Sequence, residues 1–66
     1  MKNNLKVQRA IHNLTQQDLA ERVNVSRQTI NALEAGKYVP STVLALKLAK
    51  LFEKTVDDIF ELEATD

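Results

Sequence analysis

The chain has 66 residues, no cysteine, one histidine, and nine basic side chains that balance nine acidic ones. This length allows a single domain, residues 1–66, that buries about 60% of its unfolded surface. The composition excludes disulfides and thiolate metal sites, and one histidine gives little support to a zinc site. No signal peptide is visible, and the longest apolar run, Val43–Leu46, is too short to span a bilayer. We therefore expect a soluble, cytoplasmic protein.

The charges are unevenly distributed along the chain. Residues 1–40 carry six basic and three acidic side chains, whereas residues 41–66 carry three basic and six acidic ones. A neutral total that is split in this way suits a protein with one face directed toward phosphates.

Apolar residues recur at helical spacing almost throughout, which predicts an all-α fold of five short helices. The first helix is expected from Asn4 to about His12. Its apolar side chains that are available for burial are Leu5, Val7, Ala10 and Ile11. Thr15, with Asp18 three residues later, is an acidic variant of the capping box and predicts the start of the second helix, residues 16–23.

Asn24 follows the second helix, and asparagine tolerates a left-handed backbone better than most other residues. Ser26 is expected to cap a third helix from Arg27 to about Ala35, because Gly36 lies where a helix-ending glycine belongs.

Pro40 ends the next loop, and Ser41 caps a fourth helix, residues 42–53. Apolar residues cover more than half of its circumference, so we expect it to form the buried centre of the domain. Thr55 caps a last helix, from Val56 to about Glu61. The sequence also indicates, more weakly, a short strand at residues 2–4 that pairs with the tail.

The second and third helices meet the requirements of a helix-turn-helix. The pair needs a small residue where the helices cross, which Ala20 supplies, and a turn residue that accepts an unusual backbone, which Asn24 supplies. It also needs an apolar seam, and the candidates are Leu19, Val23, Val25, Ile30 and Leu33.

Four motifs then resemble the lambda-repressor/Cro-like family, also called the XRE family: TQQDLA at 15–20, VSRQTIN at 25–31, LEAGKYVPS at 33–41 and ALKLAKLF at 45–52. The resemblance extends from Leu5 to Phe60. It implies a lambda-repressor-like DNA-binding domain, similar to small stand-alone regulators that are commonly homodimers. The chain departs from the family pattern at Asn24, where glycine is frequent, and at Gln8, where an apolar residue is usual.

The resemblance also implies roles for individual residues. Arg27, Gln28 and Asn31 match base-reading positions, and these side-chain types can be bidentate to guanine or adenine. Arg9 and Glu34 match a pair that forms a partly buried salt bridge. The positions that match phosphate contacts are Gln16, Gln17, Thr29, Lys37 and Tyr38.

A single recognition helix reads too few base pairs to stand out from competing sites. We therefore expect a homodimer on a palindromic operator, with its recognition helices about 34–36 Å apart in the major groove. The expected apolar seam between the subunits consists of Leu51, Val56, Phe60 and Leu62.

The predicted function is that of a sequence-specific transcriptional regulator, and a repressor if it blocks polymerase from its operator. The alternative is an antitoxin-like interaction module that neutralises a partner protein. The sequence offers no constellation of acid, base or nucleophile for an enzyme. We expect no cofactor, metal, membrane or small-molecule partner.

Overall fold

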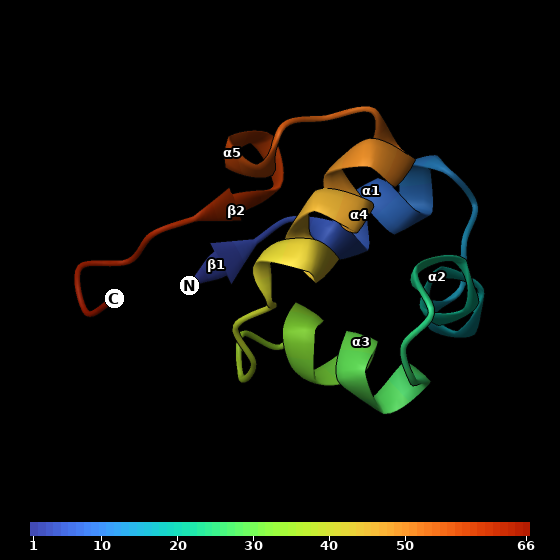
Figure 1. Cartoon of the computed structure of the whole chain (residues 1–66), viewed down its shortest axis with the longest axis horizontal. Helices are drawn as coiled ribbons and strands as arrows, with labels where there is room; N and C mark the ends of the chain where they lie inside the picture. The colour runs from blue at the N-terminus through green and yellow to red at the C-terminus, as the bar shows by residue number, and fades with distance from the viewer.

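A computed structural model describes residues 1–66, and it confirms the expected five helices and the terminal strand pair (Figure 1). In chain order the elements are β1 (Lys2–Asn3), α1 (Leu5–Ile11), α2 (Gln16–Val23), α3 (Arg27–Glu34), α4 (Thr42–Phe52), α5 (Val56–Ile59) and β2 (Phe60–Glu61). Figure 1 shows α3 along one edge of the molecule, on the side opposite α5. No helix combines the length and the apolar composition that crossing a membrane requires.

The two ends of the chain form a short antiparallel ladder. Lys2 pairs with Glu61 and Asn3 with Phe60, and the Asn4 N–H donates to the carbonyl of Ile59 at 3.0 Å. The prediction that the last helix continues to about Glu61 is therefore wrong. The backbone of Phe60 is extended (φ −113°, ψ 142°), because it joins this ladder while its ring is buried in the core.

The helix starts that were predicted from capping residues are confirmed. The Asp18 N–H donates to Thr15 Oγ1, and the Thr15 N–H donates to Asp18 Oδ2, both at 3.0 Å. Thr55 and Asp58 repeat this reciprocal pair at α5. Ser26 and Ser41 each accept one backbone hydrogen bond at the first turn of α3 and α4. These caps satisfy N–H groups that have no acceptor inside the helix.

The turn between α2 and α3 uses the expected left-handed residue, since Asn24 has φ 61° and ψ 46°. Gly36 after α3 is also left-handed, with φ 73°. Two further positive φ angles were not anticipated, at Asn13 between α1 and α2 and at Glu53 after α4.

One apolar core lies between the helices, and α4 contributes most to it, as expected. Its buried members are Leu5, Leu19, Ala20, Val23, Ile30, Leu33, Leu44, Leu48, Ala49, Phe52, Ile59 and Phe60. Only one face of α4 is covered, however, because Val43 and Leu46 are 62% and 57% exposed. The extra apolar face of α4 is therefore left at the surface.

The expected orientation of α1 is wrong. Leu5 and Gln8 are buried, whereas Val7, Ala10 and Ile11 are exposed. Arg9 explains the difference, because its guanidinium reaches inward to Glu34 and Leu14 and holds that side of α1 toward the other helices. Gln8 is carried into the core by this rotation, and Ile11 does not replace it there. The Gln8 Oε1 atom is buried without a hydrogen-bond partner.

We expect Gln8→Met to raise the free energy of unfolding by about 1 kcal/mol, since an unpartnered buried polar group costs about 1–3 kcal/mol. Methionine has a similar shape and adapts to irregular gaps in a core. Chemical denaturation of the two proteins measures the difference. Gln17→Met, at an exposed position, is the control and should change stability by less than about 0.5 kcal/mol. A loss of stability in Gln8→Met would mean that Oε1 has a partner in solution.

Candidate nucleic-acid interface

The close crossing of α2 and α3 sets the position of the candidate interface. Ala20, on the inner side of α2, is 1% exposed, so no larger side chain fits between the helices. The Val25 N–H donates to the Ala20 carbonyl at 3.0 Å and closes the turn. Ile30 and Leu33 are the buried side chains on the inner face of α3. The opposite face of α3 is thereby directed outward.

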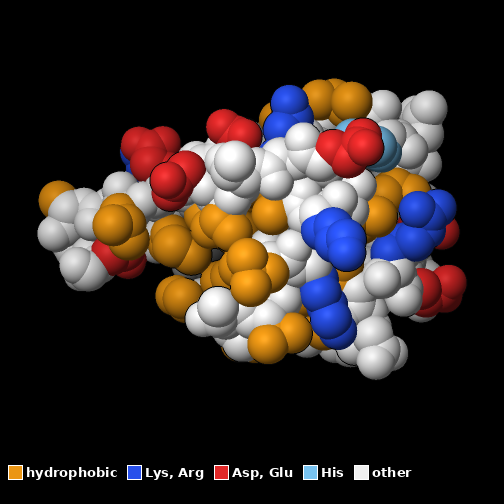
Figure 2. All heavy atoms as spheres, turned by 45° about the horizontal axis from the view of Figure 1, so that its top comes forward, with side chains coloured by type: hydrophobic (Ala, Val, Ile, Leu, Met, Phe, Trp, Pro, Cys, Tyr) orange, Lys and Arg blue, Asp and Glu red, His pale blue; other side chains and the backbone are white.

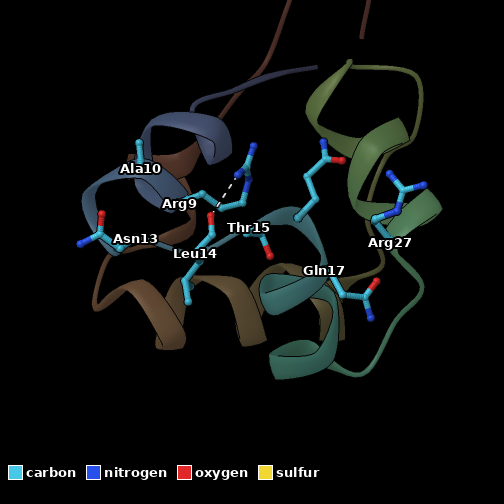
Figure 3. A pocket seen from close by; sticks show the side chains of 8 residues that line it. Arg9, Ala10, Asn13, Leu14, Thr15, Gln17 and Arg27 are labelled. Carbon is cyan, nitrogen blue, oxygen red and sulfur yellow. Dashed lines mark hydrogen bonds between the residues drawn. The ribbon is translucent and has the colours of Figure 1, made fainter.

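A polar network joins the first three helices. Arg9 of α1 binds Glu34 of α3 through two hydrogen bonds, Nε to Oε2 at 2.6 Å and Nη2 to Oε1 at 3.1 Å. Gln16 of α2 donates from Nε2 to the same Oε1 at 3.1 Å. Arg9 also donates from Nη1 to the Leu14 carbonyl at 3.0 Å (Figure 3). Two-point contact of this kind fixes both position and orientation.

The network is mostly sheltered from solvent, with the side chains of Arg9 and Glu34 15% and 7% exposed. Burial acts to raise the pKa of Glu34. The hydrogen bonds from Arg9 and Gln16, with the charges of Arg9 and Lys6, outweigh burial and hold that pKa below its usual value. The hydrogen bonds to Glu34 raise the pKa of Arg9. Both groups are therefore charged at neutral pH.

The outward face of α3 carries the three residues that were predicted to read bases. Arg27, Gln28 and Asn31 are all exposed, and none of their side chains hydrogen-bonds within the chain. They line one shallow depression together with Ala32, Ala35 and Lys37. Their donors and acceptors are free to meet an external partner.

A second depression lies beside the N-terminus of α2. It is lined by Arg9, Ala10, Asn13, Leu14, Thr15, Gln16, Gln17 and Arg27 (Figure 3). Gln16 is half-buried because it contacts Glu34, a bond that sequence reasoning missed. Gln17 is exposed and donates to Glu21 at 2.9 Å.

The other predicted phosphate contacts lie in α3 and in the loop that follows it. Thr29 is half-buried, and its hydroxyl lies 2.9 Å from that of Ser26. Lys37 and Tyr38 are exposed in the loop after α3. The Asn3 side chain, which sequence reasoning did not single out, donates from Nδ2 to the Leu33 carbonyl at 2.8 Å and anchors the end of α3 to the strand pair. A lone asparagine near the start of a chain gives no sequence signal for such a role.

The residues expected at a subunit seam occupy different environments. Leu51 and Val56 are half-buried against the core, Phe60 is 6% exposed, and Leu62 is 76% exposed. Figure 2 shows hydrophobic side chains gathered on the face formed by α4 and the C-terminal segment, with acidic and basic groups at its borders. Val43 and Leu46 of α4 add exposed apolar surface to the molecule. Phe60 has little surface left for a partner.

A family model described as helix-turn-helix matches residues 5–59 of the chain. An HTH-type transcriptional regulator of Methanocaldococcus jannaschii is 60% identical over 63 residues, which cover 96% of both chains. Another, YgzD of Bacillus subtilis, is 49% identical with the same coverage. The HTH-type transcriptional activator BcrR of Enterococcus faecalis is 39% identical over 77% of this chain but only 25% of its own length.

The network around Glu34 predicts a pH-dependent contribution to stability. Because the pKa of Glu34 is lowered by folding, its ionised form stabilises the fold above the unfolded pKa of about 4.3, and this contribution is lost as the pH falls through the folded pKa. We expect Glu34→Gln to be less stable than the wild type by about 1–3 kcal/mol at pH 7. Thermal unfolding measured from pH 7 to pH 3 should show the stability difference between the wild type and the variant becoming smaller.

Glu21→Gln is the matched control, since Glu21 lies on the exposed face of α2. Its stability should differ little from the wild type at any of these pH values. A stability difference between the wild type and Glu34→Gln that stays constant down to pH 3 would contradict a stabilising role for the ionised Glu34 carboxylate.

Proposed function

The chain belongs to the helix-turn-helix family of DNA-binding transcriptional regulators, and we propose that it regulates transcription by recognising a specific sequence in the major groove of DNA. The observation that carries this proposal is the outward face of α3. Its polar side chains are exposed and form no hydrogen bonds within the chain, although the opposite face of the same helix is buried. A B-DNA major groove is wide enough to admit such a helix.

Gln28 and Asn31 are the proposed readers of base edges. Glutamine and asparagine can each form a bidentate pair with adenine, and each good pair discriminates against a wrong base by about 1–3 kcal/mol. Arg27, which the sequence placed with them, lies at the beginning of α3 and at the edge of this face.

The proposed phosphate contacts surround this face: Gln16, Gln17, Thr29, Lys37 and Tyr38. They come from the start of α2, from α3 and from the loop after α3, so they can contact the backbone on both sides of a groove. Contacts of this kind fix the register of a protein on the duplex but do not read its sequence. Gln16 has a second amide hydrogen and its oxygen available beyond the bond to Glu34.

We further propose a homodimer on a palindromic operator, because one helix reads too few base pairs for a useful specificity ratio. The proposed seam uses the solvent-facing parts of Leu51, Val56 and Leu62, with Phe60 supporting them from the core. Val43 and Leu46 extend it on α4, since both are more than half exposed.

Repression is the proposed mode of regulation. A dimer that occupies an operator over a promoter blocks polymerase without any further contact, whereas activation needs an additional surface. The Enterococcus faecalis relative is named an activator, but the match covers only a quarter of that protein.

The readout by Gln28 can be tested on a site selected from random DNA by the wild-type protein. We expect Gln28→Ala to weaken binding to this site by about 1–3 kcal/mol and to leave binding to random duplex nearly unchanged. Fluorescence anisotropy over a salt series measures both affinities. Salt should weaken binding to both duplexes through the phosphate contacts.

Lys54→Ala, which changes a charge outside the proposed interface, is the control and should leave the ratio of the two affinities unchanged. The regulator proposal would fail if the wild type selected no sequence at physiological salt. In that case an interaction partner should be sought, as the antitoxin-like alternative requires.

The seam can be tested by placing a charge on the exposed face of α4. We expect Leu46→Glu to shift the protein from dimer to monomer in analytical ultracentrifugation, because burying an unpaired carboxylate at an interface is costly. The fold should persist, since the side chain is 57% exposed. Val7→Glu, at an equally exposed position on α1, should remain dimeric. If Val7→Glu dissociated instead, the seam would lie on α1.

A further inference from the structure

The depressions on the surface differ in the charge of their linings. Three of the five include acidic residues: Asp57, Asp58 and Glu61 in one, Asp18 and Glu21 in another, Glu34 and Glu63 in a third. The other two contain no acidic residue. They are the depression beside the start of α2 and the depression along α3. Arg27 is the one residue that lines both.

The depression beside α2 contains one uncompensated charge. Its two cationic side chains are Arg9 and Arg27. Arg9 is neutralised by the two-point ion pair with Glu34. Arg27 forms no ion pair and no side-chain hydrogen bond within the chain. The remaining polar lining consists of amide and hydroxyl groups, including Gln16 and Gln17, which can donate to an anion.

The position of Arg27 in its helix directs its side chain toward this depression. Cα–Cβ bonds in a helix tilt toward the N-terminus, and long side chains cover the turn that precedes them. Arg27 is the first residue of α3 and lines both depressions, so its side chain lies between the start of α2 and the body of α3. Figure 3 shows Arg27 at the start of α3 and Gln17 on α2 among the side chains that line this depression. At the first turn of α2 the Asp18 N–H is bonded to Thr15, and the N–H groups of Gln16 and Gln17 are left without helical acceptors and can donate to an anion.

We infer that Arg27 binds a DNA phosphate in the depression beside the start of α2, and that base readout falls to Gln28 and Asn31. This inference rests on the proposed function and assigns Arg27 a different role from the one implied by the sequence resemblance, which places it at the bases. In this arrangement Arg27 fixes the register of α3 along the groove, and the neighbouring residues of α3 then meet the base edges. One side chain thereby connects the anion-binding depression to the reading face.

The two roles respond differently to substitution. A phosphate accepts lysine as a point charge, whereas a bidentate contact with guanine requires the planar guanidinium of arginine. We expect Arg27→Lys to keep the ratio of affinities for the selected site and random duplex within about threefold of the wild type. We expect Arg27→Gln to weaken binding to both duplexes by similar factors. It should also reduce the slope of log affinity against log salt by about 0.9 in magnitude.

The experiment uses the selected site and random duplex with wild type, Arg27→Lys and Arg27→Gln at several salt concentrations. Because Arg27 is exposed, circular dichroism should show that both variants keep the fold. A drop in the affinity ratio of tenfold or more in Arg27→Lys would overturn the inference and return Arg27 to the bases. An unchanged salt slope in Arg27→Gln would also overturn it. If the wild type itself preferred no sequence, the proposed function would fail, and this outcome is distinct from both.

Discussion

The ion pair between Arg9 and Glu34 is the constraint on which the rest of the arrangement depends. It joins α1 to α3, and the hydrogen bond from Gln16 to the same carboxylate brings α2 into the network. In a domain of this size, the apolar core alone leaves helix orientations loosely determined. A two-point charge contact defines direction as well as distance. The C-terminal end of α3 is held a second time, since the Asn3 side chain donates to the Leu33 carbonyl next to Glu34.

This constraint has a cost that is visible in the core. By turning Arg9 inward, α1 also buries Gln8 with an unpartnered oxygen, and it leaves Val7 and Ile11 in solvent. An α1 that was optimised for stability alone would bury its apolar side chains. The observed orientation instead favours the contact that positions α2 and α3. Natural sequences depart from local consistency mainly where function requires it.

The features that were predicted correctly from the sequence are those set by neighbouring residues. Thr15 and Thr55 cap helices through residues three positions away, and Asn24 and Gly36 adopt the left-handed backbone that their residue types allow. The errors lie where a distant contact decides the outcome. The rotation of α1 depends on Glu34, which is 25 residues from Arg9. The end of α5 depends on the pairing of Phe60 with Asn3. Periodicity cannot reveal which side of an amphipathic helix a remote partner will select.

The acidic and basic halves of the chain also gain a physical meaning from the fold. The depressions free of acidic residues lie around the start of α2 and along α3, whereas the cluster of Asp57, Asp58 and Glu61 lines a depression at α5 and the strand pair. Figure 1 shows α5 on the side of the molecule opposite α3. A neutral protein with this distribution is attracted to a polyanion through one side and repelled through the other. Its orientation on DNA is therefore favoured before any base is contacted. Under the proposed function few cations take part, so we expect sequence-independent binding to be weak and the proposed contacts of α3 to dominate the choice of site.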